Sequence, residues 1–187
     1  MLSPRNAIEP IPAGRVQIRE LGAGDEEAFF RLASDSRVVE NVCWGPYDLE
    51  GTRAYLAQSA VNADAVPRTH YDLGIKDVST GELVGACTIK RRRDDAGWEI
   101  GYSLQPGSWG LGLGSETVAA LVAFAREHLS ARRTVAEVFL ENPASMRILE
   151  KLGFSGVRRT DRYIAARGRH RRVLLMELRT GNENGRD

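Results

Sequence analysis

The chain has 187 residues, a formal net charge of +1, and shares of 42% hydrophobic and 27% charged residues. Such values are ordinary for one soluble globular domain that is large enough to bury a core. The near-zero charge excludes a general attraction to nucleic acid or to anionic membranes. Cys43 and Cys87 lack metal-ligand spacing, so we expect thiols in a reducing, cytoplasmic compartment and no metal site. No stretch has the apolar length of a signal peptide or a membrane span.

The first third of the chain alternates between strand and helix patterns. Residues 1–14 contain three prolines and predict a flexible arm before the domain. Residues 16–21 alternate apolar and polar side chains, which predicts the first strand. The carboxylates that begin at Asp25 are typical of a helix start, and the apolar side chains after them recur at helical spacing, which predicts a helix. Residues 48–60 predict a second helix.

Residues 36–47 lie between these two helices and contain Trp44, Tyr47 and a Gly-Pro break. Two local structures fit this stretch. One is a loop whose aromatic side chains wall a pocket, and the other is a helix end that packs its aromatic side chains into the core.

The central part of the chain predicts an antiparallel meander followed by one parallel crossover. Residues 71–78 and 83–90 are joined by a Ser-Thr-Gly turn and predict a hairpin, and residues 98–104 add a further strand. A helix over residues 115–129 then leads to a strand at residues 134–140. Because a helix connects them, the last two strands should be parallel neighbours.

The C-terminal part begins with Asn142 and Pro143, which are a good N-cap and a favoured first helical residue. The helix that they start should end at Gly153. A strand then begins, an arginine-rich stretch covers residues 158–172, and a last strand closes the domain. The expected organisation is a flexible arm over residues 1–14, one domain over residues 15–179 and a flexible tail over residues 180–187.

The stretch WGLGLGSE, residues 109–116, joins a predicted strand to a predicted helix. Gly110, Gly112 and Gly114 let the backbone turn tightly and approach a ligand closely. The helix behind them begins with unpaired N–H groups and the positive end of its dipole, so the loop predicts a phosphate site. The simpler alternative is a flexible turn between strand and helix.

A dinucleotide site is the rival explanation for a glycine-rich loop. Its fingerprint requires a third glycine where this chain has Ser115, and it follows the first strand of a parallel unit. The predicted meander before the loop therefore argues against a dinucleotide site.

Two longer motifs carry a resemblance to a known family. Residues 99–118, EIGYSLQPGSWGLGLGSETV, resemble the acetyl-CoA pyrophosphate motif Arg/Gln-x-x-Gly-x-Gly/Ala, from which they depart at the first position, where Trp109 replaces the usual Arg or Gln. Residues 141–154, ENPASMRILEKLGF, match the signature Asn-x-x-Ser-x-Arg-x-Leu-Glu-Lys-x-Gly-Phe without a gap. On these motifs the chain resembles the GCN5-related N-acetyltransferases (GNAT), most closely the RimJ/RimL-like branch. The resemblance implies an α/β (α+β) fold with a mixed, mostly antiparallel twisted sheet, splayed between its fourth and fifth strands and flanked by helices.

The resemblance also implies how acetyl-CoA would be held. The pantetheine arm would lie in the gap between the two parallel strands, beside a bulge that Gly101 would permit. Asn142 would bind this arm, and Arg147 would either lie near the phosphates or pair with a carboxylate. The predicted cofactor-binding residues are Ser103, Leu104, Trp109, Gly110, Leu111, Gly112, Leu113, Gly114, Ser115, Asn142 and Arg147.

The reaction that the resemblance implies is direct attack of an amine on the acetyl thioester. The amine must first lose a proton, and a carboxylate is suited to remove it, sometimes through water. We predict Glu99 as this base, with Glu137 and His70 as alternatives.

Two further groups would stabilise the charge that develops. Main-chain N–H groups around Ser103 and Leu104 would bind the carbonyl oxygen. Ser145 stands where RimL-like enzymes carry a serine near the sulfur, so it would protonate or stabilise the leaving thiolate. The alternative is that Ser145 only hydrogen-bonds the start of its own helix.

The acceptor pocket should be formed by residues 38–47 and 158–172, with Trp44, Tyr47 and Tyr102 as the predicted substrate-binding residues. The second of these stretches is either a solvated hairpin or a site for an anionic acceptor, an acidic protein terminus or RNA. Its arginines are Arg158, Arg159, Arg162, Arg167, Arg169, Arg171 and Arg172.

We therefore expect an N-acetyltransferase that moves the acetyl group of acetyl-CoA to a primary amine on a protein N-terminus or a small molecule. Two alternatives stay open. One keeps the fold but uses an aminoacyl-tRNA or a carrier-bound acyl donor, and the other is a non-catalytic module that binds coenzyme A or RNA. A homodimer fits the family, and no membrane partner is expected.

Overall fold

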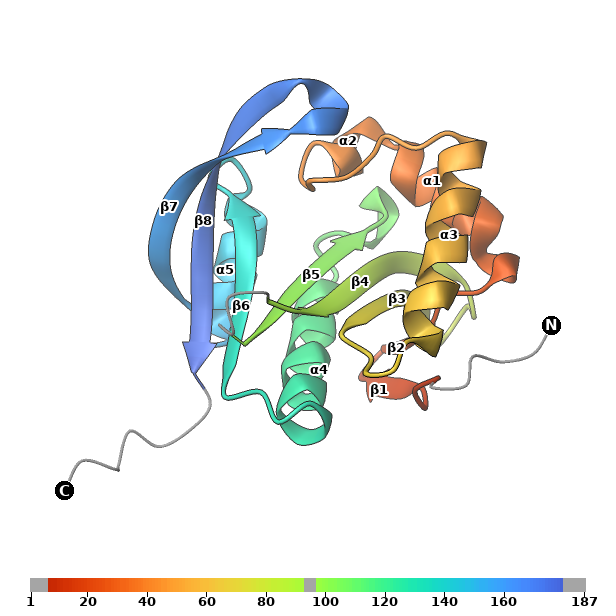
Figure 1. Cartoon of the computed structure of the whole chain (residues 1–187), viewed down its shortest axis with the longest axis horizontal. Coiled ribbons are helices and arrows are strands. Elements are labelled where there is room, and N and C mark those ends of the chain that lie inside the picture. The colour runs from red at the N-terminus through yellow and green to blue at the C-terminus, as the bar shows by residue number, and fades with distance from the viewer. Residues whose placement is uncertain (1–6, 93–96, 180–187) are drawn as a thin grey trace.

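The computed structural model describes residues 7–92 and 97–179 (Figure 1). Within these ranges, eight strands form one sheet in the order β1-β2-β3-β4-β5-β6-β8-β7. Neighbouring strands are antiparallel except β5 and β6, which are parallel, so the predicted mixed, mostly antiparallel sheet is confirmed. The strands are β1 (Ile11–Ala13), β2 (Val16–Glu20), β3 (His70–Asp77), β4 (Leu83–Arg91), β5 (Trp98–Leu104), β6 (Arg133–Phe139), β7 (Ser155–Ile164) and β8 (Arg169–Arg179).

Helices pack against both faces of this sheet. Successive side chains of a strand point to opposite faces, and the neighbours Ala86 and Cys87 on β4 accordingly belong to two different buried clusters. The Cys87 cluster includes Leu121 of α4 and Leu149 of α5, whereas the Ala86 cluster includes Phe29 of α1. The helices are α1 (Glu26–Ser34), α2 (Ser36–Val39), α3 (Leu49–Asp64), α4 (Leu113–His128) and α5 (Pro143–Lys151), with short 3-10 turns η1 (Ala23–Asp25), η2 (Pro106–Ser108) and η3 (Ala165–Arg167).

The folded part begins earlier than the sequence predicts. Ile11–Ala13 lie inside the predicted arm but pair with β2 as an edge strand, and Ala13 is buried. Residues 1–6 of the predicted arm and the predicted tail over residues 180–187 lie outside the described residues. Among the helices of the described part, none combines the length and the apolar character needed to cross a membrane.

Strands β5 and β6 separate along their length, as the sequence predicts. They pair only where Trp98 meets Thr134 and Glu99 meets Val135, and they diverge beyond these positions (Figure 1). The expected bulge in β5 is not found on its β4 side, where the register runs from Trp98 to Leu104 without a shift. The gap therefore results from the short pairing with β6 and not from an extra residue between β4 and β5.

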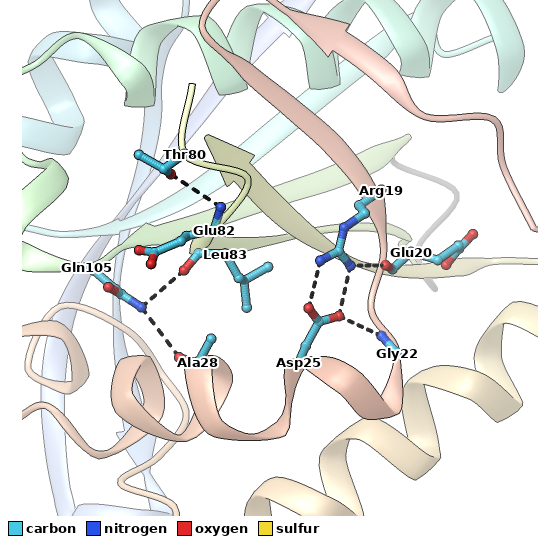
Figure 2. Close-up of polar contacts among 9 residues, drawn as sticks. All are labelled: Arg19, Glu20, Gly22, Asp25, Ala28, Thr80, Glu82, Leu83 and Gln105. Carbon is cyan, nitrogen blue, oxygen red and sulfur yellow. Dashed lines mark hydrogen bonds and ion pairs between the residues drawn. The ribbon is translucent and has the colours of Figure 1, made fainter. Parts of the chain in front are cut away.

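Polar contacts fix α1 against the sheet (Figure 2). Arg19 on β2 forms two bonds to the Asp25 carboxylate, Nη1 to Oδ2 at 2.8 Å and Nη2 to Oδ1 at 2.7 Å. Gln105, which follows β5, donates from Nε2 to the carbonyl oxygens of Ala28 at 3.4 Å and Leu83 at 3.2 Å. These contacts hold the end of β5, where the chain enters the glycine loop.

Asp25→Asn is expected to lower the free energy of unfolding by about 2 kcal/mol near neutral pH. Burial raises the pKa of Asp25, but hydrogen bonds from Arg19 and from the Gly22 N–H outweigh it, so the pKa in the fold lies below its ordinary value. The stabilisation is therefore present above about pH 4 and is lost as the pH falls through the lowered pKa. Urea unfolding of both proteins across this range measures the difference.

Glu26→Gln is the matched control for this substitution. The ion pair of Glu26 with Arg53 is exposed, so its loss should change the free energy of unfolding very little. If Asp25→Asn cost the same stability at about pH 3 as near neutral pH, the ionised carboxylate would not be the source of the effect.

Candidate active site

Two cavities open on the gap between β5 and β6. The first, here called the loop cavity, has a volume of about 460 Å³ and lies beside the glycine loop and α5. The second, here called the sheet cavity, has a volume of about 250 Å³ and lies over β3 to β6. The two cavities meet, because both are lined by Asn41, Val42, Tyr102, Ser103, Asn142 and Ser145.

The glycine loop ends at the open start of α4. Gly110 and Gly112 have φ values of 75° and 84°, in the left-handed region that favours glycine. Gly112 is the N-cap of α4, and no side chain among the described residues caps this helix. The N–H of Ser115 donates to the carbonyl oxygen of Gly112 at 3.0 Å, so Leu113 and Gly114 supply the N–H groups that precede the first intrahelical bond, beside a loop cavity that Gly112, Gly114 and Ser115 line.

Arg15, between β1 and β2, holds the glycine loop in place. Its guanidinium donates to Glu116 Oε1 at 2.9 Å and to the carbonyl oxygen of Leu111 at 2.6 Å. Its main-chain N–H donates to Glu116 Oε2 at 2.8 Å, and these bonds lower the pKa of Glu116. Because Arg15 offsets the charge of Glu116, a carboxylate in the first turn of α4 is compatible with an anion nearby.

Helix α5 forms the facing wall of the loop cavity. Asn142 Oδ1 accepts from the N–H of Ser145 at 3.1 Å, which confirms the predicted N-cap. Arg147 and Lys151 lie one helical turn apart and both line the cavity. They add two cations to a cavity whose other walls are mainly apolar.

Two hydroxyl groups lie where the cavities meet. Tyr102 Oη is 3.1 Å from Ser145 Oγ. Burial raises the pKa of Tyr102 above its ordinary value, and the hydrogen bond with Ser145 offsets only part of this rise. Gly114 leaves room for the tyrosine ring, because a Cβ there would lie 3.2 Å from Tyr102 Cε2 and 3.1 Å from Ile148 Cδ1. The third glycine of the loop thus serves the packing of Tyr102 rather than a left-handed turn.

The main-chain N–H groups of β5 point alternately to β4 and to the gap. The N–H of Gln105 donates to the carbonyl oxygen of Val84 on the β4 side at 2.8 Å. Antiparallel alternation then directs the N–H of Ser103 toward β4 and that of Leu104 toward the gap. Of the two predicted main-chain donors, the N–H of Leu104 therefore faces the gap and the N–H of Ser103 does not. Its carbonyl oxygen accepts from Trp109 Nε1 at 2.8 Å.

Ion pairs cross the floor of the sheet cavity. Glu99 contacts Lys90 Nζ through Oε1 at 2.8 Å and Arg92 Nη1 through Oε2 at 3.0 Å. Glu137 on β6 pairs with Arg162, and its Oε1 lies 3.9 Å from Arg92 Nη1. The two carboxylates that the sequence singles out thus share one cavity and are bridged by Arg92.

Asp72 is a buried carboxylate at the far side of the same cavity. His70 Nε2 lies 3.1 Å from Asp72 Oδ1, Tyr55 donates to Oδ1 at 2.9 Å, and Asn62 donates to Oδ2 at 2.8 Å. Burial raises the pKa of Asp72, but these hydrogen bonds outweigh it and the pKa is lowered. The third candidate base, His70, is therefore oriented by a carboxylate.

The predicted acceptor aromatics have different positions. Trp44 lines the sheet cavity, and Tyr102 lines both cavities. Tyr47 is absent from the described residues around either cavity and stacks on Trp44, with 5.8 Å between the ring centroids. Both structures considered for residues 36–47 are thus found in part: a short helix, then a loop whose aromatic side chains partly face a cavity and partly pack inward.

The arginine-rich stretch forms the β7–β8 hairpin. Arg162 pairs with Glu137, and Arg167, Arg169 and Arg171 contact the segment that follows α2. Much of this charge therefore serves contacts within the chain, and an anionic partner at the hairpin stays a prediction.

Several residues that line the cavities were not predicted from the sequence. Lys151 had a signal, because it follows Arg147 by one turn inside the second matched motif. Asp72 and Tyr55 had none, because only the fold brings the two side chains together. Asn41, Val42 and Arg162 lie inside the two stretches predicted for the acceptor pocket, although none of the three was predicted as a substrate-binding residue.

Comparisons with known proteins agree with this geometry. Residues 15–155 match the family model described as Acetyltransferase (GNAT) domain. YoaA of Bacillus subtilis, described as an uncharacterized N-acetyltransferase, is 31% identical over 146 residues, which cover 75% of this chain and 79% of the relative.

Two solved structures have a similar fold. RimJ of Mycobacterium smegmatis, in complex with CoA-disulfide, has a TM-score of 0.76 and 23% identity, covering 92% of this chain and 87% of that one. Spermidine N-acetyltransferase from Vibrio cholerae, in complex with CoA and spermine, has a TM-score of 0.75 and 16% identity, covering 88% and 95%. At these identities the two structures support the fold alone.

Proposed function

Because the chain belongs to the acetyltransferase (GNAT) domain family, and is therefore an acyltransferase, we propose that it moves the acetyl group of acetyl-CoA to a primary amine while both are bound. The observation that carries this proposal is the meeting of two cavities where β5 and β6 part. The loop cavity would hold the acetyl donor, and the sheet cavity would hold the amine.

The residues of the loop cavity fit coenzyme A. A diphosphate requires several N–H donors and nearby cations, and the start of α4 together with Arg147 and Lys151 offers both. The apolar walls suit a pantetheine arm, which Asn142 would meet through the amide nitrogen that its cap leaves unused. When bound, acetyl-CoA supplies a thioester whose carbonyl carbon accepts the amine.

We assign proton removal from the amine to Glu99, directly or through a water molecule. An amine with a pKa near ~10 is mostly protonated at neutral pH and is not nucleophilic in that form. Glu99 lines the sheet cavity, and Ser103 lies on the same face of β5, so one face of the sheet connects the base to the gap. Glu137 and His70 line the same cavity and are the alternative bases.

Two hydrogen-bond donors of this chain would stabilise the negative charge of the reaction. This charge develops on the carbonyl oxygen as the C–N bond forms and on the sulfur as the C–S bond breaks. The N–H of Leu104 is assigned to the carbonyl oxygen, where one such donor contributes roughly 3 kcal/mol. The Ser145 hydroxyl is assigned to the sulfur, where it would hydrogen-bond the leaving thiolate and relay to it the proton that the nitrogen loses as the amide forms. Tyr102 Oη, 3.1 Å from Ser145 Oγ, would orient this serine.

Ser145→Ala is expected to lower kcat about tenfold while the Kd for coenzyme A stays unchanged, because a single hydrogen bond to the sulfur is lost. Tyr102→Phe keeps the packed ring and should lower kcat about threefold. Since Tyr102 is assigned to act through Ser145, the double variant should be no slower than Ser145→Ala alone. Steady-state thiol release measures all three rates, and losses that multiply in the double variant would show that the hydroxyls act independently.

The direct test of the proposal is acetyl transfer by the purified protein. Acetyl-CoA is incubated with a panel that includes peptides with free N-termini, polyamines such as spermidine, and other small primary amines. We expect thiol release and a mass increase of one acetyl group for at least one class, saturable in both substrates. Coenzyme A binding without acetylation of any amine would favour a non-catalytic module, and absence of coenzyme A binding would remove the donor assignment.

A further inference from the structure

One arginine at the tip of the β7–β8 hairpin reaches across the molecule. Arg167 donates from Nη1 to the carbonyl oxygens of Val39 at 2.6 Å and Trp44 at 3.4 Å, and from Nη2 to that of Val42. Residues 39–44, here called the roof segment, thus have three carbonyl groups bonded by one guanidinium. In Figure 1 the tip of the hairpin leans toward α2, from which the roof segment continues.

The roof segment covers the place where the two cavities meet. Asn41 and Val42 line both cavities, and Cys43 and Trp44 line the sheet cavity. A donor and an acceptor that occupy these cavities would therefore lie under the same few residues. The position of the roof segment decides how well both are enclosed.

The contact from Arg167 also links the two halves of the split sheet. β5 and β6 are joined by only two register pairs, and the sheet is open beyond them. The roof segment follows α2, which packs with α1 on the half that contains β4, whereas Arg167 belongs to the half that contains β6 and β8. Arg167 therefore adds a connection across the mouth of the gap, besides the contacts of Tyr102 with Ser145 and of Arg92 with Glu137.

A guanidinium is suited to this task because its donors are held in one rigid plane. Three carbonyl oxygens that accept from one such group have their relative positions fixed, which a flexible ammonium does not achieve. Arg169 and Arg171 contact Glu40 less closely, through Oε1 at 3.7 Å and the carbonyl oxygen at 3.4 Å respectively. Arg167 thus makes the shortest contacts that the hairpin tip has with the roof segment.

We propose that Arg167 is a positioning residue that holds the roof segment over both substrate cavities. Binding of coenzyme A and of the amine would then depend on the same set of hydrogen bonds, here called the Arg167 clamp. The inference rests on the proposed function for its two substrates, while the clamp itself is a property of the fold. Arg167 touches neither substrate and acts through Asn41, Val42 and Trp44.

The proposal is tested with Arg167→Ala, Arg167→Lys and the matched control Arg126→Ala, which removes an exposed arginine of α4 that pairs with Glu127 and is absent from the described lining of both cavities. Hydrogen exchange of peptides that cover the roof segment should accelerate about tenfold in Arg167→Ala, as expected for loss of charge-assisted hydrogen bonds. The Kd for coenzyme A and the KM for the amine should both rise about tenfold, with kcat at saturation within about threefold of the wild type. Arg167→Lys should have effects between those of Arg167→Ala and the wild type, and Arg126→Ala should resemble the wild type.

The measurements of hydrogen exchange and of coenzyme A binding do not require turnover, so they test the role of Arg167 even if no amine is acetylated. Unchanged exchange in the roof segment, or faster exchange with an unchanged Kd for coenzyme A, would overturn the proposal. Equal effects in Arg126→Ala would also overturn it. If Arg167→Ala does not fold, Arg167→Lys carries the test, since it keeps the positive charge and loses the rigid fork.

Discussion

Coenzyme A should bind the Gly112→Val variant at least about 100-fold more weakly than the wild type, because the glycine loop can no longer close over a diphosphate. Gly112 has a φ of 84°, where a β-branched side chain is strained. A Cβ at this position would also lie 3.1 Å from Arg15 Nη2, the atom that bonds the Leu111 carbonyl oxygen. Titration with coenzyme A, followed by the fluorescence of Trp109 at the cavity wall, measures the loss.

Two other glycines separate the causes of this loss. Gly107→Ala is the matched control, since a Cβ there meets nothing within 4 Å and Gly107 is absent from the described glycines of positive φ, so the affinity should not change. Gly110 has a φ of 75° and open space around it, so Gly110→Ala tests backbone strain alone, about 1–2 kcal/mol or roughly tenfold in affinity. Wild-type affinity in Gly112→Val would end the assignment of the loop to the diphosphate.

The parts of the site that could be predicted from the sequence are those set by local geometry. A backbone with positive φ needs glycine, so Gly110 and Gly112 mark the loop by themselves. A helix start needs a capping oxygen, so Asn142 before Pro143 marks the start of α5. Gly114 was predicted for the same reason as its neighbours but has a different role, because it accommodates Tyr102.

The contacts that hold the site together could not be predicted from the sequence. Arg15 and Glu116 are 101 residues apart, and Arg167 and Val39 are 128 residues apart. A charged residue in a loop has many candidate partners of opposite charge or free carbonyl groups, and no periodicity selects among them. Only the order of the strands, which places β8 and β7 beyond β6, brings the hairpin near α2.

The gap in the sheet was predicted at its correct position, but the bulge that the resemblance implied beside it is not found between β4 and β5. The β4–β5 register is regular, and the β5–β6 pairing simply stops after Glu99 and Val135. A parallel pair that ends early leaves the N–H of Leu104 facing the gap, so the role proposed for this N–H does not require a bulge.

Glu99→Gln should lower kcat about 100-fold, because an amide takes no proton from the attacking ammonium group. The loop cavity does not include Glu99 among its described lining residues, so the Kd for coenzyme A should stay unchanged. The loss should shrink as the pH is raised, because a larger fraction of the amine is then neutral without help from a base. Rates of thiol release from the wild type and the variant, measured between about pH 6 and pH 10, test both expectations.

The ion pairs of Glu99 require their own control, since the amide also loses the charge that Lys90 and Arg92 contact. Lys90→Gln breaks one of these pairs and keeps the carboxylate, so it should lower kcat no more than about threefold. Glu137→Gln and His70→Asn remove the alternative bases in the same cavity. A Glu99→Gln variant that retains its rate, while one of these two loses about 100-fold, would move the base to that residue. A loss in Lys90→Gln equal to that in Glu99→Gln would instead mean that the ion pairs, and not proton transfer, set the rate.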